Sequence, residues 1–465
     1  MFNKEKYVGA NLQYNGYRLP TEAEWEWLAR KSERNSITKF SWGKTLPIPK
    51  MTGNLADEAA VDAADPKKIL SPNLPAPPKG KTVVIGCGKG VAQMDAELEQ
   101  SWDSDLSGVV VTRYGFSDKC KKIKVLEAAH PVPDENGLRA AKSIFEVLEG
   151  LTADDLVIAL ICGGGSALLP FPPTDFKLSD EQELNKVLLN SGAPIGVMNA
   201  IRKHFSQVKG GQLALAAYPA PVVTLVVSDV PGDDPSQVAS GPTIADKVSI
   251  QEAISLVNAY KIDIPTNIKE YFEKEITNAP SFDDPRFSKN DVKVIASSNI
   301  SLIAASKKAE ELGFQSYILS DAIEGRASDV GIMHAALAKY RKDKNTTFQR
   351  PAVILSGGET TVEILDKPGR GGRNTEFLLA FALSIEKEPN ITALAADTDG
   401  IDGSENNAGA FCDGTTAFKM REKGFNPRMH LIKHDAWTAF NGVDELFTPG
   451  PTGTNVNDFR AILLS

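Results

Sequence analysis

Two glycine-rich turns carry residue types that could bind an anion. The segment GCGKG, residues 86–90, surrounds Lys89 with three glycines, and the segment CGGGS, residues 162–166, ends in a serine. Such turns leave backbone N–H groups free to face a ligand, and a lysine adds a positive charge. They predict a phosphate site, although a tight strand-to-helix turn with a capping serine is the structural alternative.

The same pattern recurs far along the chain. The segment AVILSGGETTV, residues 352–362, also takes an apolar run into two glycines and then a hydroxyl residue. We therefore expect both halves of the chain to present a glycine-rich strand end to a ligand. The residues predicted to bind nucleotide phosphates are Gly86, Gly88, Gly90, Gly163, Gly164, Gly165, Ser166, Gly357 and Gly358.

Three familiar motifs are incomplete at these turns. The phosphate loop G-x-x-x-x-G-K-[ST] is absent, and Val91 stands where the dinucleotide-binding pattern G-x-G-x-x-G requires its third glycine. The following apolar run ends near Arg113 and lacks the acid that would bind a ribose. Leu168 replaces the last glycine of G-x-S-x-G, which argues against a serine-hydrolase elbow.

Cations suited to an acidic substrate occur in two further segments. In GVMNAIRKHFSQVKGG, helical spacing predicts that Asn199, Arg202, Ser206 and Lys209 share one helix face. That face could bind a carboxylate or a phosphate, or it could simply be solvated.

The segment KPGRGGRNTEF holds Arg370 and Arg373 among glycines, immediately before a helix expected to start at Asn374. Two guanidinium groups and a free helix N-terminus would together form an anion trap.

Acidic residues follow other apolar runs. Asp229 ends one such run and is followed by Asp234, while Asp397 and Asp399 end another. A strand-end carboxylate can accept a proton or hold Mg²⁺, although turns and helix caps also use aspartates. The segment after Asp397 does not match a calcium-binding EF-hand loop. A polar segment near the C-terminus, GPTGTNVNDF, is expected to close over a site or to cap the last helix.

These segments together lack a catalytic cysteine or histidine. Glycine-rich anion sites, fixed cations and strand-end acids are the mixture that phosphoryl transfer needs, because positioning and charge neutralisation do most of the work.

Short apolar runs alternate with amphipathic segments through most of the chain. This rhythm predicts an α/β fold, with parallel sheets covered on both faces in both halves and ligands beyond the carboxyl ends of the strands. Helices are expected at about 90–99, 299–313, 324–342 and 374–386. The 465 residues suggest several domains, and we place boundaries at 1–60, 61–290 and 291–465.

Composition limits the kinds of partner that the protein could bind and the compartment in which we expect it. The net charge of −9 and the lack of a basic block argue against nucleic acid, and no apolar run approaches the length needed to cross a membrane. The N-terminus lacks the apolar middle of a signal peptide, so we expect a cytoplasmic protein. The four cysteines form no metal-binding or disulfide pattern. A homodimer is compatible with the sequence.

Residues 61–465 resemble glycerate 2-kinases of the MOFRL type. The resemblance is carried by GCGKG, EAAHPVPDENGL, CGGGSALLP, MNAIRKHFSQVKGGQLA, SDVPGDDPSQVASGPT, LSGGETTV, GRGGRNTEF, ADTDGIDGSENNAGA and GPTGTNVNDF. It implies a Rossmann-like N-terminal domain, a smaller α/β C-terminal domain and an interdomain cleft. It also implies transfer of the γ-phosphoryl group of ATP to the 2-hydroxyl of D-glycerate, with Mg²⁺.

The resemblance also suggests roles for individual residues. Lys89, Asp229 and Arg373 are expected to be catalytic. Residue type and position, apart from the resemblance, predict substrate binding by Arg202, Lys209, Arg370 and Asn374 and metal binding by Asp234, Asp397 and Asp399. Cys87 and Cys162 stand where we expect alanine or serine, and an accessible thiol there would make activity sensitive to oxidation.

Residues 1–60 resemble a fragment of the formylglycine-generating, sulfatase-modifying enzyme family. The similarity lies in GYRLPTEAEWEWLAR, FSWGKTLP and GNLAD. That family's reactive cysteines have no counterpart here, so we expect the fragment to be non-catalytic.

Two other functions stay open at this point. An NAD(P)-dependent hydroxypyruvate reductase fits the turn GCGKG after an apolar run, although the third glycine and the ribose-binding acid are missing. A non-catalytic nucleotide or sugar-phosphate binding protein would use the same anion sites without turnover.

Overall fold

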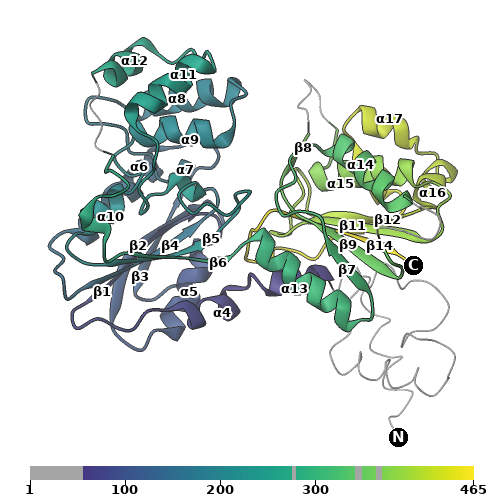
Figure 1. Cartoon of the computed structure of the whole chain (residues 1–465), viewed down its shortest axis with the longest axis horizontal. Coiled ribbons are helices and arrows are strands. Elements are labelled where there is room, and N and C mark those ends of the chain that lie inside the picture. The colour runs from purple at the N-terminus through teal and green to yellow at the C-terminus, as the bar shows by residue number, and fades with distance from the viewer. Residues whose placement is uncertain (1–55, 275–278, 341–347, 363–368) are drawn as a thin grey trace, which may run out of the picture. The chain divides into compact units, whose positions relative to one another are not determined.

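The computed structural model describes residues 56–274, 279–340, 348–362 and 369–465 (Figure 1). The chain divides into a unit of residues 1–51 and a compact unit of residues 52–465, and all described residues belong to the second. The N-terminal fragment predicted for residues 1–60 therefore lies almost wholly outside the described residues. Its last residues, 56–60, are helical, and Ala56 and Ala60 are fully buried.

The first sheet has six parallel strands in the order β3-β2-β1-β4-β5-β6. The strands are β1 (Thr82–Cys87), β2 (Leu106–Arg113), β3 (Ile123–Ala128), β4 (Leu156–Cys162), β5 (Val222–Val227) and β6 (Asp291–Ala296). Every residue of β1, β4 and β5 is buried, as expected for strands covered on both faces. This strand order is that of a Rossmann fold, which confirms the predicted Rossmann-like domain.

The end of the first sheet differs from the predicted boundary at residue 290. Strand β6 begins at Asp291 and pairs with β5, so the chain leaves this sheet only after Ala296.

Helices cover both faces of the first sheet. On one face lie α6 (Glu135–Leu148) and α10 (Gln212–Ala217), and on the other lie α4 (Pro66–Ile69) and α5 (Val91–Ser101). The short helix α7 (Gly165–Leu168) follows β4. The strand order reverses between β1 and β4, which is where a sheet of this type binds ligands beyond its strand ends.

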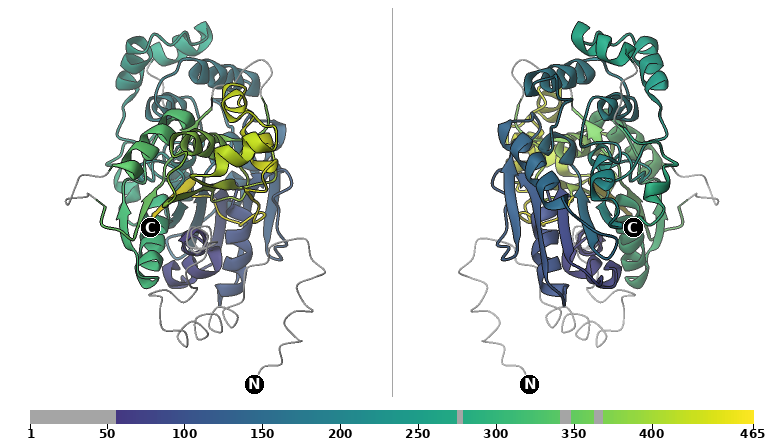
Figure 2. Two further views of the ribbon diagram at one scale, coloured as in Figure 1. Left: turned by 90° about the vertical axis from the view of Figure 1, so that its right-hand side faces the viewer. Right: turned by 90° about the vertical axis from the view of Figure 1, so that its left-hand side faces the viewer.

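A second, smaller core gathers helices away from the first sheet. They are α8 (Leu178–Asn190), α9 (Ile195–His204), α11 (Ile250–Ala259) and α12 (Thr266–Glu273), and they group together in Figures 1 and 2. Phe176, Phe205 and Tyr271 pack edge to face at its centre, with ring centroids 4.8–5.8 Å apart.

The second sheet is mixed, with the order β13-β12-β11-β14-β9-β7. Its strands are β7 (Gln315–Ile318), β9 (Ala352–Ser356), β11 (Ile391–Asp397), β12 (Gly409–Asp413), β13 (Leu446–Phe447) and β14 (Asp458–Leu464). Only β7 and β9 pair in parallel within it. A separate pair joins β8 (Gly325–Arg326) to β10 (Thr360–Thr361).

The prediction of a parallel sheet in the second half is thus wrong. The buried strand β14 runs antiparallel to both β9 and β11 and lies between them. The polar segment before it, predicted to close over a site or to cap the last helix, leads into this last strand and caps no helix among the described residues.

The predicted helices of the second half are confirmed. They are α13 (Ser298–Glu311), α14 (Ala327–Lys339) and α15 (Arg373–Ser384), and shorter helices follow as α16 (Thr416–Glu422), α17 (Pro427–Ile432) and α18 (Ala436–Asn441). Residues 374–382 of α15 are all buried, so this helix forms the centre of the core that packs on the second sheet.

Candidate active site

The turns after β1 and β4 are held against each other by their backbones. The Lys89 N–H donates to the Gly163 carbonyl at 2.9 Å, and the Gly88 N–H donates to the Val111 carbonyl at 3.1 Å. Gly88 has φ = +132°, and a Cβ there would lie 2.6 Å from the Cys162 carbonyl oxygen. Both the backbone conformation and the close approach therefore require glycine at position 88.

A pocket lies at this switch point. Its lining includes the predicted residues Lys89, Gly90 and Gly163. The remaining lining residues are Ala64, Pro66, Met94, Cys162, Val227, Gly453, Thr454 and Asn455. The loop before β14 of the second sheet thus contributes Gly453, Thr454 and Asn455 to the pocket.

The other glycine pair, Gly357 and Gly358, does not line that pocket. The Gly357 N–H donates to the Ser320 carbonyl at 2.8 Å, and the Gly357 carbonyl accepts from Arg460 Nη1 at 3.0 Å. A side chain on Gly358 would overlap the backbone of Ile323. In this structure the second glycine-rich strand end therefore serves close packing, not a shared edge of the pocket.

Asp229 follows β5 and lies against the β4 turn. A side chain on Gly163 would overlap the Asp229 carboxylate, so glycine is needed there for the approach. Burial raises the pKa of Asp229 to about 6, Glu359 adds to the increase, and Lys89 and Arg373 oppose it. Asn457 Nδ2 donates to the Asp229 carbonyl at 2.6 Å. Asp229 is thus a carboxylate of raised basicity, and it lies close enough to Lys89 and Arg373 for both charges to lower its pKa.

His130 also lies at this turn, and the sequence analysis did not select it. A Cβ on Gly164 would lie 3.1 Å from His130 Nε2 and 3.2 Å from Lys89 Cγ. Burial lowers the pKa of His130 to about 4, and the charges of Lys89 and Arg113 add to the decrease. His130 belongs to the segment EAAHPVPDENGL, but nothing in the spacing of that segment predicts where the imidazole lies.

A polar chain leads away from Ser166. Its hydroxyl lies 2.9 Å from Ser240 Oγ, which contacts Asn199 Oδ1 at 3.2 Å. Arg202 Nη1 donates to the same Asn199 oxygen at 3.2 Å, and its Nε donates to Asn185 Oδ1 at 2.8 Å. Arg202 is therefore connected to Ser166 through buried side chains.

The predicted shared helix face is not formed. Helix α9 ends at His204, so Ser206 and Lys209 lie beyond it. Lys209 is buried and pairs with Glu181 at 2.8 Å. The prediction assumed an unbroken helix through a segment where the chain turns.

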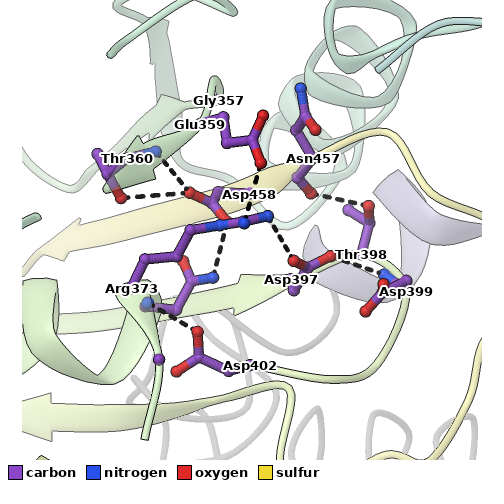
Figure 3. A network of polar contacts seen from close by, with 12 residues as sticks. Gly357, Glu359, Thr360, Arg373, Asp397, Thr398, Asp399, Asp402, Asn457 and Asp458 are labelled. Carbon is purple, nitrogen blue, oxygen red and sulfur yellow. Dashed lines mark hydrogen bonds and ion pairs between the residues drawn. The ribbon is translucent and has the colours of Figure 1, made fainter. Parts of the chain in front are cut away.

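Arg373 is surrounded by three carboxylates, as Figure 3 shows. Its Nε donates to Asp458 Oδ1 at 2.7 Å, its Nη1 to Glu359 Oε1 at 3.0 Å, and its Nη2 to Asp397 Oδ2 at 2.6 Å. Of these three partners only Glu359 is substantially exposed, at 48%. The arm of the guanidinium that faces Glu359 is therefore the most open to exchange.

Asp458 is the centre of this network. Besides Arg373, it accepts from Asn374 Nδ2 at 2.8 Å, from both the N–H and the hydroxyl of Thr360, and from Arg460 Nη2 at 2.6 Å. Burial opposes its ionisation, but Arg373 and Arg460 hold the pKa of Asp458 below its ordinary value. The sequence analysis noted Asp458 only as part of a polar loop and missed both it and Arg460 as members of the site.

The predicted anion trap at α15 is not open. Asp402 accepts from the N–H groups of Asn374 and Thr375 at 2.9 and 2.8 Å and so caps the helix N-terminus. Arg370 pairs with Glu405 at 2.6 Å and stacks on Trp437 at 3.6 Å. The expectation was wrong because loop carboxylates far along the chain fold back onto these donors.

The three residues assigned to a metal differ in their surroundings. Burial raises the pKa of Asp397 well above its ordinary value; Arg373 opposes this, while Asp399 and Asp458 add to it. Asp234 is exposed and accepts from the Ser236 N–H at 2.9 Å. Across residues 56–465, gaps in the description aside, no three His, Cys, Asp or Glu side chains gather in a way suited to a metal ion.

The two cysteines at the turns are shielded. Cys87 and Cys162 are buried, and burial raises the pKa of Cys87 to about 12 and that of Cys162 further. Cys162 Sγ lies 3.2 Å from Met94 Sδ. The condition for oxidation sensitivity, an accessible thiol, is therefore not met at either position.

Two family models match the chain. A domain of unknown function, DUF4147, matches residues 55–273, and the MOFRL family matches residues 352–458. Neither model supports the resemblance to the sulfatase-modifying enzymes, which stays a prediction from the sequence. Within the described residues, no helix is both long and apolar enough to span a membrane.

Named relatives extend this similarity over most of the chain. A protein of Agrobacterium vitis, provisionally named hydroxypyruvate reductase, is 47% identical over 88% of this chain and 92% of its own length. The glycerate 2-kinase of Pyrococcus horikoshii is 38% identical over 82% of this chain and 86% of its own. The crystal structure of glycerate kinase from Thermotoga maritima is 33% identical, with a TM-score of 0.80 over 90% of this chain and 100% of its own. The chain belongs to the glycerate kinase family that carries the MOFRL domain.

Proposed function

We propose that this protein is an ATP-dependent glycerate 2-kinase that converts D-glycerate to 2-phosphoglycerate, with release of ADP. The observation that carries the proposal is the position of Asp229, a carboxylate of raised pKa beside Lys89 at the switch point of a Rossmann sheet. Relatives named as glycerate kinases support the choice of substrate.

The phosphates would bind at the turns after β1 and β4. Lys89 lines the pocket there, and within the described residues it has no carboxylate partner. A fixed ammonium group beside glycine-rich backbone can offset the charge of phosphate oxygens. The proposed role of Lys89 is to stabilise the phosphoryl group as it moves.

Asp229 would act as the base. Its carboxylate would accept the proton of the 2-hydroxyl while that oxygen forms a bond to the γ-phosphorus. The bond from the γ-phosphorus to the bridging oxygen of ATP would break, and its electron pair would leave with ADP. A pKa of about 6 suits this task, because the group is mostly ionised at neutral pH yet more basic than an ordinary aspartate.

Arg373 would supply charge through its Glu359 arm. The two inner carboxylates hold the guanidinium in place, and the exposed Glu359 is the partner that an anionic ligand could replace. Among the residues predicted to bind substrate, Arg202 is the best placed, because it is linked to Ser166. Lys209, Arg370 and Asn374 already bind Glu181, Glu405 and Asp458.

The acids at the end of β11 are the candidates for holding Mg²⁺, although no three acids among the described residues form a ready metal site. Burial raises the pKa of Asp397, and the nearby Asp399 and Asp458 add to the increase, so a cation bound beside Asp397 would stabilise its ionised form. Asp397 and Asp399 would hold the ion, and Asp234 is less suitable because it is exposed in its own turn. A bound Mg²⁺ would neutralise phosphate charge.

The decisive experiment incubates the protein with ATP, Mg²⁺ and D-glycerate and identifies the phosphoglycerate isomer formed. We expect 2-phosphoglycerate and stoichiometric ADP. The name of the Agrobacterium vitis relative makes hydroxypyruvate reduction the second candidate. Oxidation of NADH or NADPH by hydroxypyruvate without ATP would favour it over the kinase.

A further inference from the structure

Arg113 follows Val111 and Thr112, which hydrogen-bond to the backbone of Gly88 and Lys89, and it has no role in the proposed reaction. It ends β2, and its guanidinium carbon lies 3.5 Å from the centroid of the Phe116 ring. Its Nε is buried and has no hydrogen-bond partner in the structure. Stacking on an aromatic ring fixes the plane of a guanidinium but satisfies none of its N–H donors.

Arg460 also has a buried Nε without a hydrogen-bond partner, but Arg113 differs from the other arginines near the site in its lack of a carboxylate partner. Arg373 and Arg460 each bind carboxylates through at least one nitrogen at 2.6 Å, whereas the structure gives Arg113 no ion pair among the described residues. Buried donors in proteins usually have a partner, so a fixed guanidinium with an unpartnered buried Nε and no ion pair is a candidate for binding an anionic ligand. Asp399 and Asp397 are near enough to raise its pKa, although burial lowers it more strongly.

Lys89 and His130 lie on the same side. Both contact the position that a side chain on Gly164 would occupy, and both Lys89 and Arg113 depress the pKa of His130. An imidazole kept neutral beside two cations can still donate one hydrogen bond. Lys89, Arg113 and His130 thus bring three potential donor side chains close to the glycine turn after β4.

We propose that Arg113 and His130, together with Lys89, bind an anionic oxygen group of one reactant, either the carboxylate of glycerate or a phosphate of the nucleotide. This inference rests on the proposed kinase function for the identity of those reactants. The planar fork of arginine matches both groups, and the Phe116 ring holds that fork ready.

The first test compares steady-state kinetics of Arg113→Gln with those of Arg139→Gln. Arg139 is an exposed arginine whose contacts lie within its own helix, so its variant controls for the loss of one charge. We expect Arg113→Gln to raise one KM by about 10- to 100-fold, as for a lost hydrogen bond to a charged group. A rise for D-glycerate assigns the carboxylate, and a rise for ATP assigns the phosphate.

The second test does not depend on turnover. Isothermal titration measures the binding of pyrophosphate and of D-glycerate to the wild-type protein, Arg113→Gln, Arg113→Lys and His130→Gln. We expect Arg113→Gln to weaken one ligand at least tenfold, Arg113→Lys to restore part of the affinity, and His130→Gln to weaken the same ligand by about two- to tenfold. Melting temperatures close to that of the wild type would show that the variants are folded.

These results separate the two proposals. If the wild-type protein binds the anion but has no kinase activity, and Arg113→Gln loses that binding, the inference stands and the proposed function fails. If the wild-type protein is an active kinase and Arg113→Gln leaves both KM values and both affinities within twofold, the inference is overturned.

Discussion

The cations at the strand ends of the two sheets have opposite surroundings. Beside the first sheet, Lys89 and Arg113 have no carboxylate partner among the described residues, and the nearest imidazole is neutral. Beside the second sheet, Arg373 and Arg460 bind a set of acids centred on Asp458. Both regions follow a strand end with glycines, yet in the second the cations are already paired with carboxylates.

This difference indicates that the two regions are suited to different roles. Unpaired cations beside glycine turns are suited to hold phosphate oxygens, whereas a buried network of acids and arginines is suited to hold its own members rigid and to attract a metal ion. Similar sequence patterns therefore produce cations without carboxylate partners in one case and a network of paired arginines and acids in the other.

The largest effect on activity should come from Lys89→Met. Loss of a fixed charge that meets the transferring phosphoryl group should lower kcat by about 10³-fold, with the fold unchanged. Lys142→Met, on the exposed surface of α6, is the matched control. Rates within threefold of the wild type for Lys89→Met would remove this lysine from the chemistry and weaken the contrast between the two regions.

The next largest effect is expected for Asp229→Asn, which should lower kcat by about 10²- to 10³-fold because the base is lost. In the wild type, kcat/KM should fall as the pH drops below about 6, where Asp229 becomes protonated. This acid arm should be missing from the residual activity of the variant.

The raised pKa of Asp229 also predicts how the stability of the folded protein depends on pH. Its pKa is higher in the folded than in the unfolded protein, so the folded state binds the proton more tightly and Asp229 costs stability as the pH rises from about 4 to 6. Asp229→Asn should therefore melt at an equal or higher temperature than the wild type at pH 7. A clearly lower melting temperature would point to a structural role for the ionised carboxylate.

Asp458→Asn tests the second region. Removing this charge leaves the fully buried Arg460 uncompensated, and the free energy of unfolding should fall by about 3–5 kcal/mol, measured by denaturant titration. Glu445→Gln is a useful comparison, because Glu445 is also buried but pairs with a partly exposed lysine and should cost less. Equal losses would show that the Asp458 network has no special weight.

The smallest effect is expected for Arg370→Gln. Its guanidinium is exposed and pairs with Glu405 at the surface, so kcat and both KM values should stay within twofold of the wild type and the melting temperature should not change measurably. A tenfold loss of activity would instead restore Arg370 to the substrate-binding role predicted from the sequence.

Much of the fold could be predicted from the sequence because it depends on local patterns. Buried runs such as those of β1 and β4, and the helices α13 and α15, follow from hydrophobic periodicity and from their flanking glycines and caps. The mixed order of the second sheet could not be predicted, because it depends on where the C-terminal strand β14 inserts, and strand pairing over such distances leaves no periodic signal.

The sequence by itself determined the glycine turns, the position of Lys89 in one of them and Asp229 at a strand end, since each depends on residue type and close neighbours. Only the tertiary structure decided which charges are available. Asp402, Asp458 and Glu405 fold back onto donors that looked free, while the end of β2 and the loop after β3 bring Arg113 and His130 near the glycine turns. The reason is physical: an electrostatic environment depends on distances between groups remote in sequence, and folding alone sets those distances.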